Sequence, residues 1–455
     1  MASPQRHIAS GISFMMETLR PEQKRSHSKF MAASIKTRAS MPTGKLAGIL
    51  AAISLLSVAG GIAQPQGPQT AARPAPANAS SSAQFQSLSK RAMAALDADK
   101  LPEAIPLFRK ALALDPHWVE GWWSLGTAYY DQESYAEAEL AFQRVVAIDP
   151  RNGTAHALLG LCEFELGDDK SALRDIEAGK DLGTDLDPQL RNAIFYHEGV
   201  LLQRAGRFVS AEMPFASLCQ GGTRGADLVK GFGMAALRMR DRQFPPPGSE
   251  PAIVAELVGR AACAAAARDF DNARRQLTFV TETYPHFPYV HYVFGRVLVD
   301  ASDLPDAVAE FKREIDEGHD QVLPLLQIAA SQYKVDPAAG LPYAQQAVAL
   351  APKLPFAHYL FGLLLASTDQ EEKAIPELEI ARKAFPQDMK VYWSLATAYA
   401  RVGRAQDAAK ARAEVARLSH KSAEQAGGAA PGSGVGDSSD TPIQVPDAAA
   451  QSPQN

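Results

Sequence analysis

The chain has 455 residues, of which 46% are hydrophobic, so it can bury several cores or one extended array. It carries 46 Lys and Arg against 51 Asp and Glu, and because residues 1–63 are basic, the remainder has a net charge of about −11. Phosphate binding requires clustered positive charge, which excludes a nucleic-acid ligand for this acidic body.

Residues 1–63 have the features of an export signal. An apolar run, Leu46 to Val58, follows Arg38 and Lys45 and precedes Gly61-Ile62-Ala63, a small-x-small cleavage pattern. The basic region before it is long, so translation could begin at an internal methionine. Export with cleavage after Ala63 is one expectation. Membrane anchoring through Leu46 to Ala63, at the short limit for a span, and a chance apolar run are the alternatives.

Two further segments have the composition of disordered chain. Residues 64–83 are rich in Pro, Gln, Ala and Ser and show no apolar period, and residues 422–455 return to the same character. We expect a flexible linker and a flexible C-terminal tail.

The stretch from Val119 to Asn152 is the unit that the rest of the chain repeats. Counted from Val119, it places large, small and closing residues at positions 4, 7, 8, 11, 20, 24 and 32, filled by Trp122, Leu125, Gly126, Tyr129, Ala138, Phe142 and Pro150. Residues three and four apart share one helix face, so these positions describe two helices packed together. The pattern resembles the 34-residue tetratricopeptide repeat. The resemblance implies an all-α superhelix of helix-turn-helix units in which the first helices line the concave face.

The register continues on both sides of this unit. Units begin near Phe85, Val119, Gly153, Asn192, Val254, Pro288, Gln321, Pro355 and Met389, and a half unit begins at Ala226. The pattern fails across residues 224–253, where a proline-rich loop follows a lone first helix. We therefore expect an N-terminal block at 84–223, a break or bend at 224–253, and a C-terminal block at 254–421.

Residues with catalytic or metal-binding chemistry form no recognisable motif. There is no nucleophile elbow, P-loop, zinc-protease helix or dinucleotide fingerprint, so neither an enzyme nor a cofactor or metal is expected. Cys162, Cys219 and Cys263 lack paired spacing; they are interpreted as core residues, with one disulfide of unassigned pairing as the alternative. Three histidines at position 4 of their units, His156, His291 and His358, are interpreted as packing residues.

The candidate binding site is an aromatic groove. Positions 5, 9 and 12 of the first helices are expected to face the concave side, and position 2 extends the series. Aromatic residues stand at positions 2, 5 and 12, and they are Trp123, Tyr130, Phe164, Tyr196, Tyr289, Tyr292, Phe356, Tyr359 and Trp393. Aromatic side chains outside the helix-pair core are natural anchors for a partner chain. The alternative is that several of them pack between adjacent units.

Two functions remain open. The first is a non-enzymatic scaffold, outside the cytoplasm, that binds proteins or peptides along the groove and resembles exported bacterial tetratricopeptide proteins. With an acidic body, basic or mixed-charge partners are favoured. The second is an accessory component of an envelope process, polysaccharide export or peptide processing, with its site in the irregular middle segment.

Overall fold

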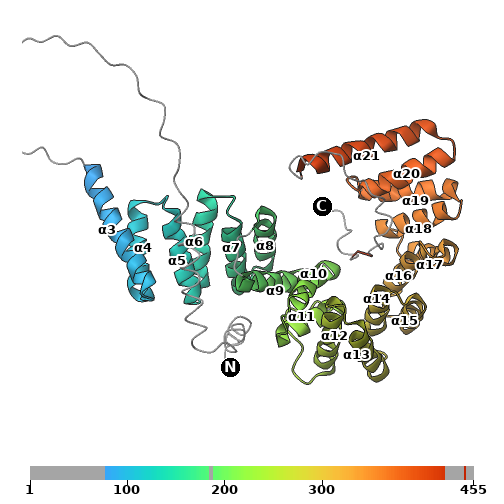
Figure 1. Ribbon diagram of the computed structural model, residues 1–455, viewed down its shortest axis with the longest axis horizontal. Helices are drawn as coiled ribbons and strands as arrows, with labels where there is room; N and C mark the ends of the chain where they lie inside the picture. Colours follow the sequence, from blue (N-terminus) through green and yellow to red (C-terminus); the bar gives the residue numbers. More distant parts are fainter. Residues whose placement is uncertain (1–76, 184–187, 426–444, 447–455) are drawn as a thin grey trace, which may run out of the picture. The chain divides into compact units, whose positions relative to one another are not determined.

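The computed structural model describes residues 77–183, 188–425 and 445–446, and these residues form helices and no strand (Figure 1). They fall into two compact units that divide between Leu186 and Asp187. The first unit contains α3 (Ala77–Asp97), α4 (Leu101–Leu114), α5 (Val119–Asp131), α6 (Tyr135–Ile148), α7 (Gly153–Leu166) and α8 (Asp169–Leu182). The all-α fold predicted from the sequence is confirmed.

The second unit contains thirteen helices among the described residues. They are α9 (Pro188–Arg204), α10 (Phe208–Gln220), α11 (Ala226–Ala236), α12 (Glu250–Ala266), α13 (Phe270–Thr283), α14 (Val290–Asp300), α15 (Leu304–Glu317), α16 (Val322–Gln332), α17 (Pro337–Leu350), α18 (Pro355–Ser367), α19 (Glu371–Ala384), α20 (Met389–Arg401) and α21 (Ala405–Gln425). Each first helix packs against the second helix that follows it.

In five helix pairs, a glycine at position 8 faces a large side chain at position 24. A Cβ added to Gly295 in α14 would lie 2.5 Å from the Phe311 ring of α15, and one added to Gly126 would lie 3.0 Å from the Phe142 ring. Ala138, at position 20, is fully buried. Only a small residue fits at these crossings, because interiors are close-packed and an inserted methyl group has no space to occupy.

The large residue at position 4 of a unit also has a polar function. Trp122 Nε1 donates to the Pro116 carbonyl at 2.9 Å, and the Tyr392 hydroxyl donates to the Pro386 carbonyl at 3.3 Å. His358 Nε2 makes the equivalent contact with Pro352 O at 2.9 Å. In each case the donor follows the closing proline by six residues. The side chain thus satisfies a carbonyl that the end of the preceding helix leaves without a backbone partner.

The three histidines at position 4 each pair with a carboxylate nineteen residues later. The Nδ1–oxygen distances are 2.7 Å for His156 with Asp175, 2.6 Å for His291 with Glu310, and 2.5 Å for His358 with Glu377. His358 thus bridges Glu377 and Pro352 through its two ring nitrogens. Sequence analysis interpreted these histidines as packing residues and did not predict that each of them pairs with a carboxylate.

The irregular middle segment differs from the predicted break. Helix α11 packs closely against α12: a Cβ added to Gly233 would lie 1.8 Å from the Ala255 carbonyl oxygen, and one added to Gly259 would lie 1.8 Å from the Val229 carbonyl oxygen. A disulfide joins Cys219 of α10 to Cys263 of α12, with Cα atoms 5.2 Å apart. Close backbone packing therefore holds α11 to α12, and a covalent bond holds α10 to α12. Residues 237–249, which include the predicted proline-rich loop, contain no helix. The two compact units divide earlier, between Leu186 and Asp187.

The ends of the array extend beyond their predicted limits. Helix α3 begins at Ala77, inside the linker predicted at 64–83, because its alanine-rich sequence favours helix. The predicted leader at 1–63 and most of the predicted tail lie outside the described residues. Among the described helices, none is long and apolar enough to cross a membrane.

Candidate binding surface

The first helices of the second unit lie next to one another. Contacts join α12 to α14, α14 to α16, α16 to α18 and α18 to α20, in addition to the contacts within each helix pair. Side chains at position 5 of these helices therefore project from one layer. This is the layer on which the sequence placed the aromatic groove.

The nine predicted groove residues divide into three groups by exposure. Trp393 of α20 is 61% exposed, whereas Tyr292 and Phe356 are buried, at 0% and 7% exposed. The other six are half-buried, and they are Trp123, Tyr130, Phe164, Tyr196, Tyr289 and Tyr359. Tyr292 and Phe356 are therefore core residues, and Tyr292 packs on the next unit as in the predicted alternative, whereas Trp393 is exposed.

In the first unit the aromatic residues of α5 pack partly on α6. The Trp123 ring meets Phe142 edge-on with centroids 5.9 Å apart, and Tyr130 meets Tyr135 edge-on at 5.5 Å. Burial, followed by the negative charge of Glu165, raises the pKa of Tyr130 well above its ordinary value. Tyr130 therefore stays a neutral hydroxyl at physiological pH, suited to hydrogen bonding and not to proton transfer.

Tyr289 precedes α14 and is held in place on several sides. Its hydroxyl donates to Asp320 Oδ2 at 3.3 Å, and the guanidinium of Arg238 lies 5.9 Å from the ring centroid. Burial first, and then Asp320, raise the pKa of Tyr289 to about 12. The residue has a left-handed backbone, with φ of 69°, which is uncommon for a non-glycine residue.

The carboxylate of Glu314 explains how this backbone is stabilised. Its two oxygens accept from the backbone N–H groups of Tyr289, at 2.9 Å, and Tyr292, at 3.0 Å. Glu314 thus caps the first turn of α14, where the helix dipole favours a negative charge. Sequence analysis missed this residue, although it stands at position 27 of its unit, where the repeat pattern has a small residue.

A half-buried ion pair lies beside Tyr292. Arg296 of α14 donates from a terminal guanidinium nitrogen to Glu212 Oε1 of α10 at 2.6 Å, and its guanidinium is 5.9 Å from the Tyr292 ring centroid. Burial disfavours the charge, but the negative charge of Glu212 outweighs it and the pKa of Arg296 is raised. The pair joins α14 to α10, and removing one partner would leave a half-buried charge uncompensated.

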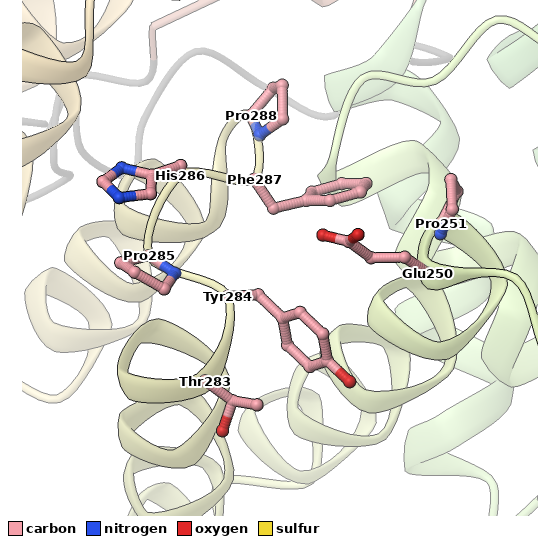
Figure 2. A pocket seen from close by; sticks show the side chains of 8 residues that line it. All are labelled: Glu250, Pro251, Thr283, Tyr284, Pro285, His286, Phe287 and Pro288. Atoms are coloured by element: carbon pink, nitrogen blue, oxygen red, sulfur yellow. The ribbon is translucent and has the colours of Figure 1, made fainter.

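Near the start of α12 a cavity of about 390 Å³ opens between Glu250 and Pro251 and the segment Thr283–Pro288. Figure 2 shows the Tyr284 ring, the Phe287 ring and the Glu250 carboxylate facing the same space, while the His286 ring points away. His286 Nδ1 is instead 2.8 Å from Glu317 Oε2. The polar groups that line this cavity are the Glu250 carboxylate and the hydroxyls of Thr283 and Tyr284, together with His286.

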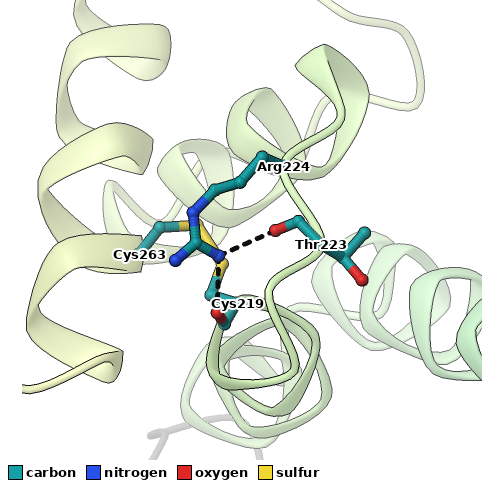
Figure 3. The surroundings of a disulfide bond; sticks show 4 residues. All are labelled: Cys219, Thr223, Arg224 and Cys263. Atoms are coloured by element: carbon teal, nitrogen blue, oxygen red, sulfur yellow. Dashed lines mark hydrogen bonds between the residues drawn. A yellow bond between two sulfur atoms is a disulfide. The ribbon is translucent and has the colours of Figure 1, made fainter.

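The glycine-rich turn after α10 is occupied by its own chain. Arg224 donates hydrogen bonds to the carbonyl of Cys219 at the end of α10 and to the carbonyl of Thr223 at 2.9 Å, directly beside the disulfide with Cys263 (Figure 3).

Burial raises the pKa of the remaining thiol, Cys162. Across the described part of the chain, no three His, Cys, Asp or Glu side chains are grouped so as to hold a metal ion.

Comparison with known proteins gives one family. The tetratricopeptide-repeat profile matches residues 89–153, 261–321 and 359–423. These three regions are tetratricopeptide repeats. The repeats form a protein-interaction fold, and the resemblance proposed from Val119 to Asn152 is confirmed. No curated protein matches the chain.

Several solved structures resemble part of the tetratricopeptide array. One is "MamA RS-1 ArsTM double mutant", 22% identical, with a TM-score of 0.35, covering 37% of this chain and 95% of that chain. Another is "MamA 41-end from Desulfovibrio magneticus RS-1", 22% identical, with a TM-score of 0.34, covering 36% of this chain and 94% of that chain. A third is "Crystal structure of YrrB: a TPR protein with an unusual peptide-binding site", 18% identical, with a TM-score of 0.33, covering 36% of this chain and 84% of that chain.

Proposed function

We propose that this protein is a non-enzymatic scaffold that binds partner proteins or peptides on its first-helix layer. The observation that carries the proposal is the 61% exposure of Trp393, a large aromatic side chain at a position where the fold leaves it uncovered. Exposed aromatic residues of this kind contribute large contact area at small entropic cost when a partner binds.

Neighbouring residues extend the surface around Trp393. Tyr359 of α18 is half-buried, its ring lies 6.2 Å from that of Phe356, and it is close enough to Ser394 of α20 to form a hydrogen bond that acts on its pKa. Burial is the largest influence on Tyr359 and raises that pKa. Tyr359 and Trp393 therefore belong to adjacent first helices on one surface, and both stay uncharged.

Site-specific cross-linking tests this surface. A photoreactive aromatic residue in place of Trp393 is expected to cross-link a partner in envelope extracts, whereas the same residue in place of Phe279 is not. Phe279 is the matched control because it is 53% exposed but lies on a second helix, α13. Equal cross-linking from both positions, or from neither, would exclude the first-helix layer as the binding surface.

We propose further that the protein acts outside the cytoplasm, in the periplasm or at the cell surface. The signal-like segment ending at Ala63 supports this location, and so does the disulfide between Cys219 and Cys263, because disulfides persist in oxidising compartments. N-terminal sequencing of the mature protein is expected to begin at Gln64. A mature chain that retains Leu46 to Ala63 in the membrane fraction would instead support anchoring.

A further inference from the structure

Val445, far into the segment predicted to be a free tail, is buried. Only 3% of its surface is exposed, and it belongs to the same packed cluster as Tyr292 and Phe356. Tyr289 and Tyr359 pack against this cluster with part of their surface still exposed. A residue of the tail therefore belongs to the packed cluster to which aromatic residues of the first-helix layer also contribute.

The described segment, residues 445–446, has a conformation suited to docking as an extended peptide. It has no helical structure, and Pro446 is half-buried beside Val445. Proline disfavours the helical conformation of the residue before it, so a Val-Pro pair is extended and presents a branched apolar side chain at low entropic cost. Figure 1 draws this segment on the inner side of the curve that the helices of the second unit follow.

The origin of the occupant follows from the chain itself. The last helix ends at Gln425 and the buried residue is Val445, so the ligand is covalently tethered to the surface that it covers. A tethered ligand competes at an effective concentration in the millimolar range, without any requirement for tight intrinsic binding. A second copy of the chain or a lipid surface is not needed to explain the burial.

We propose that Val445 and Pro446 form an internal ligand of the second unit, and that they compete with partner segments of the same chemistry, an extended branched-aliphatic residue followed by proline. This inference rests on the proposed scaffold function and names a peptide class for it. The tail then lowers the apparent affinity for a partner, because the partner must displace Val445 and Pro446 before it binds.

The magnitude of the competition can be estimated. If the tethered segment has an effective concentration of about 1 mM and an intrinsic dissociation constant of about 100 µM, it occupies the surface roughly ten to one. Removing it should then raise the apparent affinity for a competing peptide by ~10-fold.

A fluorescein-labelled synthetic peptide covering residues 440–450 is the probe, added to full-length protein and followed by fluorescence anisotropy. Val445→Asp is expected to bind the probe ~10-fold more tightly than the wild-type chain, since a buried unpaired charge would release the tail. Val435→Asp is the matched control, because it places the same charge in the same tail and is expected to bind as the wild type does. Circular dichroism checks that helix content is unchanged in both variants.

Equal affinity of the wild type and Val445→Asp for the probe, or failure of Val445→Asp to bind it, would overturn the internal ligand. The scaffold function is tested separately, by partner cross-linking at position 393 in the wild-type chain and in the Val445→Asp variant. Cross-linking without probe binding would retain the scaffold and reject the internal ligand. Probe binding without cross-linking would retain the internal ligand and reject the wider partner-binding surface.

Discussion

Adding one methyl group at the crossing of α11 and α12 should destabilise the second unit. In Gly233→Ala the new Cβ would lie 1.8 Å from the Ala255 carbonyl oxygen, a backbone atom that cannot rotate away. An ordinary carbon–oxygen contact is about 3.3 Å, so the helices must separate by roughly 1.5 Å, and a gap of this size forfeits at least half of the local dispersion energy. Overpacking of this kind costs about 3 kcal/mol or more.

Thermal unfolding and hydrogen exchange measure the effect. A loss of about 3 kcal/mol corresponds to a fall in Tm of roughly 6–12 °C for a unit of this size. Amide protection in α11 and α12 should fall more than in α18 to α20, because repeats unfold locally. Gly221→Ala is the matched control, since its added Cβ would lie 3.5 Å from its nearest neighbours. A Gly233→Ala protein with the Tm and the α11–α12 protection of the control would refute this packing.

Three further predictions concern the histidines and the disulfide. His358→Trp and Glu377→Ala should each lower the urea midpoint, while the double variant should recover most of the loss, because the unit with Trp122 at position 4 has Ala141 at position 23. Additive losses would contradict this coupling. Burial lowers the pKa of His197 to about 4, so the imidazole stays neutral in the folded state, whereas in the unfolded state it gains a proton below about pH 6.5. The free energy of unfolding should therefore fall by up to ~3 kcal/mol between pH 6.5 and 4. His197→Gln should reduce this pH dependence in urea titrations, and an unchanged pH dependence would count against the prediction. Reduction with dithiothreitol should cost ~4 kcal/mol in the wild type, from the 44-residue separation of Cys219 and Cys263, and nothing in the double serine variant; an equal response in both would show that the bond contributes no stability.

The repeat register was predictable because it depends on local periodicity. The predicted unit starts at Val119, Gly153, Pro355 and Met389 coincide with the first residues of α5, α7, α18 and α20. Small residues at positions 8 and 20 follow from contacts within one helix pair, and such contacts recur in every unit. One sequence window therefore contains the information needed to place them.

Exposure of the groove residues was not predictable, because it depends on neighbouring units. Tyr292 and Trp393 both occupy position 5, yet Tyr292 is fully buried and Trp393 is 61% exposed. Tyr292 has Phe311, with ring centroids 6.0 Å apart, and Gln327 of the following unit, whose amide donates to its hydroxyl at 3.3 Å. Trp393 lies in the last helix pair of the described array and has no following first helix to cover it.

The disulfide pairing also lay beyond local pattern. Cys219 and Cys263 lie on α10 and α12, which touch each other although α11 lies between them in sequence. Whether these two cysteines meet depends on how closely α10 and α12 approach each other, and α11 packs against both helices, with close approaches to α12 at Gly233 and Gly259. Neither glycine stands out in the repeat pattern as a contact between these two helices.

The bridge between α10 and α12 changes how the chain would carry tension. A pull applied along the polypeptide passes from Cys219 to Cys263 through the sulfur–sulfur bond, so the intervening segment that contains α11 bears no load. Unfolding by force would extend the repeats on either side while the enclosed residues added nothing to the contour length. Reduction of the bond would add those residues to the extension, and the second unit would yield at lower force.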